Sequence, residues 1–143
     1  MNFPILSSLI LLPIIGALFL FFTKDKDGNN LTAKYVSLFT TIVNFLISIY
    51  LWTSFDQSTS SFQFIEDREW INGFINYKVG VDGISILFII LTTFITPLCI
   101  ISVNNTIKVR LRDFLIAILI MESFMIGVFC ALDLVVFYLF FEA

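Results

Sequence analysis

Long apolar runs separated by short polar segments dominate this chain. Four runs cover residues 3–22, 31–55, 83–103 and 114–131, and a fifth begins at 133 and continues to residue 143. A helix of about 20 apolar residues is as long as the ~30 Å hydrocarbon core of a bilayer is thick. The pattern therefore predicts an all-α, multi-pass membrane bundle of about five helices, of which the last is truncated.

The segment 56–82 interrupts this pattern because it is polar and acidic. Polar and aromatic residues alternate from Ser61 to Phe64, which is typical of a strand, and Asn72-Gly73 favours a tight turn. We therefore predict a small β-hairpin at the membrane surface. Asp82 directly precedes the third run and is predicted to cap that helix.

The last two runs can be joined in two ways, since no proline separates them. One continuous helix would carry the eight large apolar residues from Leu134 to Phe141 into water. At ~1.5–3 kcal/mol for each side chain, this exposure costs more than ~10 kcal/mol. A bend at Ala131–Asp133, with Asp133 as the N-cap of a fifth helix, avoids that cost and is the predicted structure.

Two carboxylic acids lie within these runs, Glu122 before the bend and Glu142 after it. Nine or ten residues separate each from the bend, so both are expected about 14 Å below the surface, near the midplane. Acids inside a membrane are candidates for function, and a low dielectric favours their protonated forms. We predict that Glu142 handles protons, whereas Glu122 has either a functional or a structural role.

Other polar residues lie deep in the second and third runs. Asn44 is predicted to form a hydrogen bond between helices. Pro97 follows Thr92, Thr93 and Thr96, whose hydroxyls are predicted to bond the carbonyl that the proline leaves free. The proline marks either a packing kink or a hinge beside a path.

Composition narrows the class further. Hydrophobic residues make up 59% of the chain and charged residues 13%, whereas soluble domains have about 45–50% and 25%. The chain contains no histidine, the commonest metal ligand, and its two cysteines lack metal-binding spacing. We therefore predict no metal site, and the lack of a basic patch argues against a nucleic-acid partner.

Basic residues set the predicted orientation. Segments 24–34 and 104–113 carry three basic residues each, whereas acids outnumber basic residues in 56–82. The positive-inside rule places the two basic segments in the cytoplasm or matrix, and the N-terminus and segment 56–82 outside.

Several motifs together resemble one family. They are Gly80-Val81-Asp82-Gly83-Ile84-Ser85, Leu91–Ile100, Met121–Phe129, Ala131–Leu134 and Phe140-Phe141-Glu142-Ala143. With them the whole chain resembles the N-terminal part of subunit 4 (chain M) of proton-pumping NADH:quinone oxidoreductase, respiratory complex I.

The resemblance implies an antiporter-like subunit of the membrane arm, which translocates protons as electrons pass from NADH to quinone. It implies no redox or catalytic centre in this chain, since NADH, FMN, iron–sulfur clusters and quinone belong to the rest of the complex. The implied partners are other membrane-arm subunits and lipid, in a bacterial or mitochondrial inner membrane. Glu142 matches the family's essential fifth-helix glutamate, whose lysine partner lies on a later helix outside this chain.

Two alternatives remain open at this point. Subunits of sodium/proton antiporters and membrane hydrogenases share the Val-Asp-Gly pattern and the fifth-helix glutamate. The unfinished fifth helix would also fit a truncated, non-functional remnant.

Overall fold

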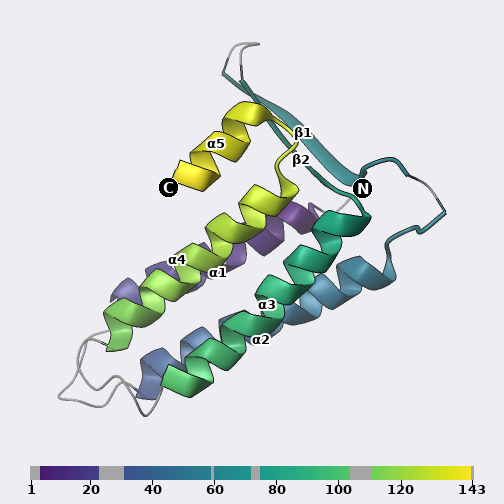
Figure 1. Ribbon diagram of the computed structural model, residues 1–143. Helices are drawn as coiled ribbons and strands as arrows, with labels where there is room; N and C mark the ends of the chain where they lie inside the picture. Colours follow the sequence, from purple (N-terminus) through teal and green to yellow (C-terminus); the bar gives the residue numbers. More distant parts are fainter. Residues whose placement is uncertain (1–3, 23–30, 59, 72–74, 104–110, 143) are drawn as a thin grey trace.

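Four long helices lie side by side and form the body of the molecule (Figure 1). The computed structural model describes residues 4–22, 31–58, 60–71, 75–103 and 111–142. The long helices are α1 (Ile5–Phe22), α2 (Leu31–Thr53), α3 (Gly83–Val103) and α4 (Leu111–Cys130). A short helix, α5 (Leu134–Glu142), and two strands, β1 (Gln63–Ile71) and β2 (Ile75–Val81), gather at one end of this bundle.

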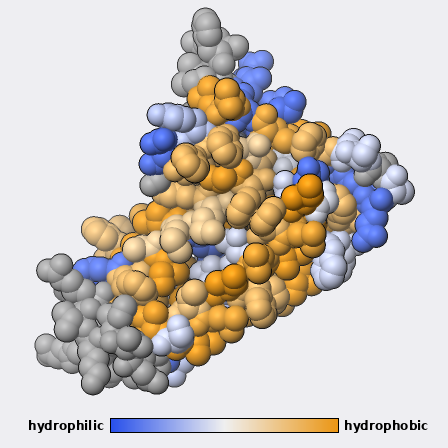
Figure 2. All heavy atoms as spheres, in the orientation of Figure 1, coloured by the Kyte–Doolittle hydropathy of each residue, from blue (hydrophilic) through white to orange (hydrophobic). Residues whose placement is uncertain are grey.

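All four long helices are long and apolar enough to cross a membrane. Large apolar side chains stay exposed along them, including Ile15 and Phe39, which are 60% and 71% exposed. Figure 2 shows the result on one face, where hydrophobic residues cover the helices and hydrophilic ones collect near the strands. A surface this apolar over the length of a bilayer is what lipid, or other membrane helices, would cover.

The helix bounds agree closely with the apolar runs, with one informative difference. The structure begins α4 at Leu111, three residues before the predicted start, and thereby includes Arg112 and Asp113. An acidic residue in a first turn is favourable because it faces the positive end of the helix dipole. Asp113 therefore favours a helix that begins before its apolar run.

The predicted hairpin is confirmed. Strands β1 and β2 pair antiparallel, with Arg68 opposite Tyr77 and Asp67 opposite Lys78. The register shifts between Gln63 and Glu66, and the positive φ of 55° at Phe64 lies within this irregular stretch. The Asn72-Gly73 turn lies outside the described residues.

The hairpin contacts the start of α1. The backbone N–H of Ser7 donates to Oε2 of Glu66 over 3.2 Å, and the Ser7 hydroxyl donates to the same oxygen. Ser7 lies in the first turn of α1, where backbone N–H groups have no partner within the helix. Tyr77 completes the contact, 3.2 Å from the Ser7 hydroxyl, and burial raises the pKa of this tyrosine.

The hairpin also contacts the α4–α5 bend. The backbone N–H of Leu132 donates to the Lys78 carbonyl over 2.9 Å, and Val79 forms an isolated bridge with Ala131. The short β-structure therefore connects the beginning of the first helix to the bend that precedes the fifth.

Both predicted N-caps are confirmed. Asp82 accepts a 2.8 Å hydrogen bond from the Ser85 amide, which lowers the pKa of this carboxyl. Asp133 accepts a 2.8 Å bond from the Val135 amide, and α5 begins at Leu134. The predicted bend is therefore correct.

Candidate functional site

A buried polar layer crosses the middle of the four-helix bundle, between two apolar clusters. One cluster, which includes Leu9 and Ile126, lies toward the hairpin, and the other, which includes Leu20 and Leu119, lies toward the opposite end. Glu122 falls between the two clusters on α4 and is fully buried. Polar groups in such a position are nearly always hydrogen-bonded.

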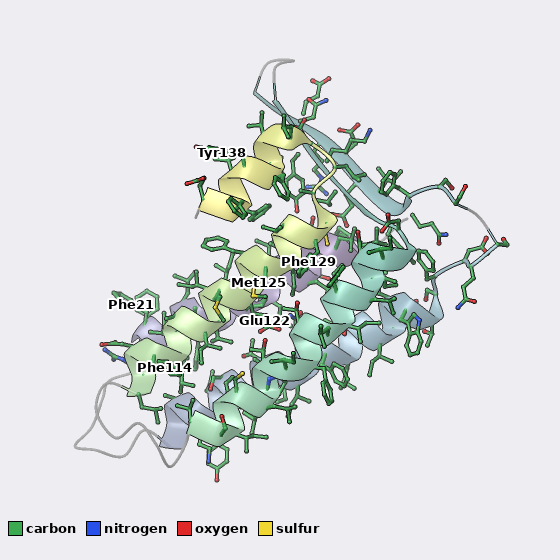
Figure 3. All side chains as sticks on the ribbon, viewed as in Figure 1. Phe21, Phe114, Glu122, Met125, Phe129 and Tyr138 are labelled. Atoms are coloured by element: carbon green, nitrogen blue, oxygen red, sulfur yellow. The ribbon has the colours of Figure 1, made fainter. Side chains whose placement is uncertain are left out.

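Glu122 bonds to α2. The amide nitrogen Nδ2 of Asn44 donates to Oε1 of Glu122 over 3.0 Å, and both side chains are 0% exposed. This contact confirms the prediction that Asn44 bonds between helices. In Figure 3, Glu122 lies on the side of α4 that faces the other long helices, away from α5.

Small polar residues continue this layer along α2. Ser37, Thr41, Asn44 and Ser48 recur at spacings of three and four, which places them on one face of the helix. All four are 0% exposed. The hydroxyls of Ser48 and Thr93 lie 2.8 Å apart and join α2 to α3. The α2 face therefore contributes an almost continuous polar column to the bundle interior.

The prediction that the α3 threonines bond the carbonyl freed by Pro97 is wrong. The carbonyl that loses its usual donor at Pro97 belongs to Thr93, four residues earlier. Thr92 and Thr96 instead donate to the carbonyls of Phe88 and Thr92 over 2.9 and 2.8 Å. Thr93 donates to Ile89 and Ile90, so the three hydroxyls bond other turns of the helix.

Ser123 adds a contact with α1. Its hydroxyl donates to the Ile10 carbonyl over 2.5 Å, and Ser123 is fully buried next to Glu122. Sequence reasoning did not identify this residue, since a single serine in an apolar run carries no signal of its partner. Residues of α4 thus bond α1 and α2 at neighbouring positions.

The two membrane acids lie in different surroundings. Glu142 is exposed near the end of α5, whereas Glu122 is buried and bonded to α2. Contacts between α4 and α5 run instead through Phe124 and Phe140, whose ring centroids are 6.1 Å apart, and through Gly127. Since Phe124 and Glu122 are two helical positions apart, they point to nearly opposite faces of α4.

Four apolar helices of bilayer length, with a polar layer enclosed between them, define a multi-pass α-helical membrane protein. A family model described as NADH-ubiquinone oxidoreductase chain 4, amino terminus, matches residues 8–128. The chain belongs to this family, as its motifs indicated.

Relatives from bacteria and a plant agree with this assignment. The chain is 48% identical to NADH-quinone oxidoreductase subunit M of Rhodobacter capsulatus over 97% of its own length and 27% of the relative. It is 41% identical to NADH-ubiquinone oxidoreductase chain 4 of Marchantia polymorpha, over 96% of this chain and 28% of the relative. For subunit M of Rickettsia typhi, identity is 40% and the coverages are 100% and 30%. The chain thus spans less than a third of these relatives.

Proposed function

We propose that this chain takes part in proton translocation within the membrane arm of a NADH:quinone oxidoreductase. The family assignment supports this function, as does a bundle of bilayer length with a polar interior. The observation that carries the proposal is the position of Glu142. It lies nine residues beyond the capped bend at Asp133, on a helix that turns back along α4.

Glu142 is the proposed proton-carrying acid. At 1.5 Å per residue it lies about 14 Å from the bend, which is close to half the thickness of a ~30 Å bilayer core. Its side chain is exposed in the described part of the chain, and is therefore available to groups outside it. Glu122, which lies in the buried polar layer, has a supporting role in this proposal.

The remaining parts of the proposal concern the complex. NADH, FMN, iron–sulfur clusters and quinone would be bound by other subunits, and this chain would supply no redox centre. Its exposed apolar faces would contact other membrane-arm subunits and lipid. The membrane would be the bacterial inner membrane, or the mitochondrial inner membrane if the chain is organellar.

The proposal is tested by Glu142→Gln in the complete subunit, within its complex. Glutamine keeps the size of the side chain but cannot release a proton, so NADH-driven proton uptake by inverted membrane vesicles should be lost. Tyr138→Phe is the matched control, because Tyr138 is exposed one turn earlier on α5 and should leave pumping unchanged. Near-normal pumping by the glutamine variant, at normal subunit abundance, would refute the assigned role.

A further inference from the structure

The contact between Asn44 and Glu122 leaves two buried oxygen atoms unpartnered among the described residues. They are Oε2 of Glu122 and Oδ1 of Asn44. The other polar atoms of these two groups form the 3.0 Å bond from Nδ2 to Oε1. Oε2 lies on the same carboxyl group as Oε1, and Oδ1 lies on the same amide group as Nδ2. Both unpartnered oxygens therefore belong to this contact. Two acceptors left over in one buried contact indicate a missing donor hydrogen.

No cation compensates a charge on Glu122 in the part of the chain that the structure describes. Asn44 is the one hydrogen-bond partner found for its carboxyl group there. Lys34 lies on the same helix as Asn44 but ten residues away, about 15 Å along the axis. An ionised Glu122 would thus be an uncompensated charge between two apolar clusters, which proteins avoid.

Few titratable groups lie on the elements packed against α4. Helix α1 has none. The others carry the following groups: Lys34, Tyr35 and Tyr50 in α2, Cys99 in α3, Tyr138 and Glu142 in α5, and Tyr77 and Lys78 in β2. Within the described residues none of them bonds to Glu122, so the Asn44 amide determines how this acid is satisfied.

We infer that Glu122 is a proton-binding site that keeps its proton, and that its acid hydroxyl donates to Oδ1 of Asn44. The amide then donates through Nδ2 and accepts through Oδ1, while the acid accepts through Oε1 and donates through Oε2. A single proton satisfies both leftover oxygens and closes a ring of two hydrogen bonds. The proton is held between α2 and α4.

This arrangement gives Glu122 a different task from that proposed for Glu142. Loss of the proton would break the bond from Glu122 to Oδ1 of Asn44. Two acceptors, Oε2 of Glu122 and Oδ1 of Asn44, would then have no hydrogen between them. Leu119 and Ile126, one turn to either side of Glu122, are both 0% exposed and shield the site from water. Glu122 is therefore a positioning residue, which holds α2 against α4 while the exposed Glu142 is the acid that exchanges.

The first test is Glu122→Gln in the complete subunit within its complex. Glutamine reproduces the shape of the protonated acid, and its amide can both donate to and accept from Asn44. NADH-driven pumping should stay within about twofold of wild type, because both bonds survive. Loss of pumping at normal subunit abundance would overturn the inference. Glu142→Gln in parallel keeps the proposed function separately testable.

The second test reads the proton directly. In the infrared difference spectrum of wild type minus Glu122→Gln, a protonated carboxylic acid gives a carbonyl band that shifts in D₂O. Asn44→Leu keeps a similar volume but removes both bonds, so this band should move to higher frequency and subunit abundance should fall. Carboxylate bands in the first spectrum, in place of the acid band, would overturn the inference even if Asn44→Leu fails to assemble.

Discussion

The contact between Gly127 and Phe140 fixes how α5 packs on α4, and it can be perturbed by one methyl group. A Cβ atom at Gly127 would lie 2.7 Å from Cγ of Phe140 and 2.8 Å from both of its Cδ atoms. Ordinary van der Waals contact begins at 3.4 Å, so the ring would have to retreat by about 0.7 Å. Rotation about the Cβ–Cγ bond leaves Cγ in place, so turning the ring cannot supply this distance, and the whole Phe140 side chain or α5 itself must move.

The cost of Gly127→Ala follows from two opposing terms. Overpacking by one methyl group costs about 1–3 kcal/mol, while alanine in place of glycine within a helix gains up to about 1 kcal/mol. The net effect is a weaker α4–α5 contact and a displaced α5. Glu142 lies two residues beyond Phe140, and a misplacement near 1 Å can lower a rate by up to ~100-fold. We expect NADH-driven pumping to fall at least about tenfold, within that limit.

The assay is proton uptake by inverted vesicles, measured for Gly127→Ala alone and combined with Phe140→Leu. Leucine removes the ring, so the alanine should then be tolerated, and the two changes should couple by about 1–3 kcal/mol. Gly83→Ala is the matched control, because a Cβ there meets no atom within 4 Å. Equal loss from Gly127→Ala in both backgrounds would refute the steric reasoning.

Two further predictions concern the bend and the orientation. Asp133→Ala removes the acceptor of the Val135 amide and should cost about 0.5–2 kcal/mol, seen as a lower midpoint for thermal inactivation of pumping, while Asp133→Asn should retain most of the stability. An equal loss in both variants would argue against capping. In a chain whose own cysteines are replaced by alanine, Ser60→Cys should react with an impermeant maleimide from outside, and Asn105→Cys only after permeabilisation. The opposite pattern would invert the predicted orientation.

Elements of this fold could be predicted because they follow from local composition. The third apolar run coincides with α3 at both ends, since the Asp82 cap and the following polar segment mark its limits. The bend at Asp133 was predictable for an energetic reason, because the alternative exposed a long apolar segment. Each of these inferences needs only neighbouring residues and the thickness of a bilayer.

Contacts between distant segments were less accessible from the sequence. Asn44 was expected to bond another helix, but nothing local indicates that its partner is Glu122, 78 residues later. The depth of Glu122 follows from its distance to the bend. The direction of its side chain depends instead on how α4 is rotated about its own axis. That rotation is set by packing, including the close approach at Gly127. The depth of Glu122 was therefore predictable, whereas the direction in which its side chain points was not.

One signal in the sequence did carry information about the site. Ser37, Thr41, Asn44 and Ser48 repeat at helical spacing within an apolar run, and a polar column of this kind must face the interior of a bundle. The column predicts which face of α2 is buried. It does not predict that Ser48 meets Thr93 or that Ser7 meets Glu66, because the register between separate elements is not encoded locally.

The separation of Asn44 from Glu122 along the chain has a consequence for biosynthesis. At ~5–20 residues per second, the chain needs about 4–16 seconds to grow by the 78 positions from Asn44 to Glu122. During that interval α2 has entered or approached the membrane with an amide that lacks its eventual partner. The amide must then be satisfied by water, by lipid headgroups or by the insertion machinery. The arrival of α4 supplies the buried partner of this amide, so the final packing of α2 depends on the synthesis of a later helix.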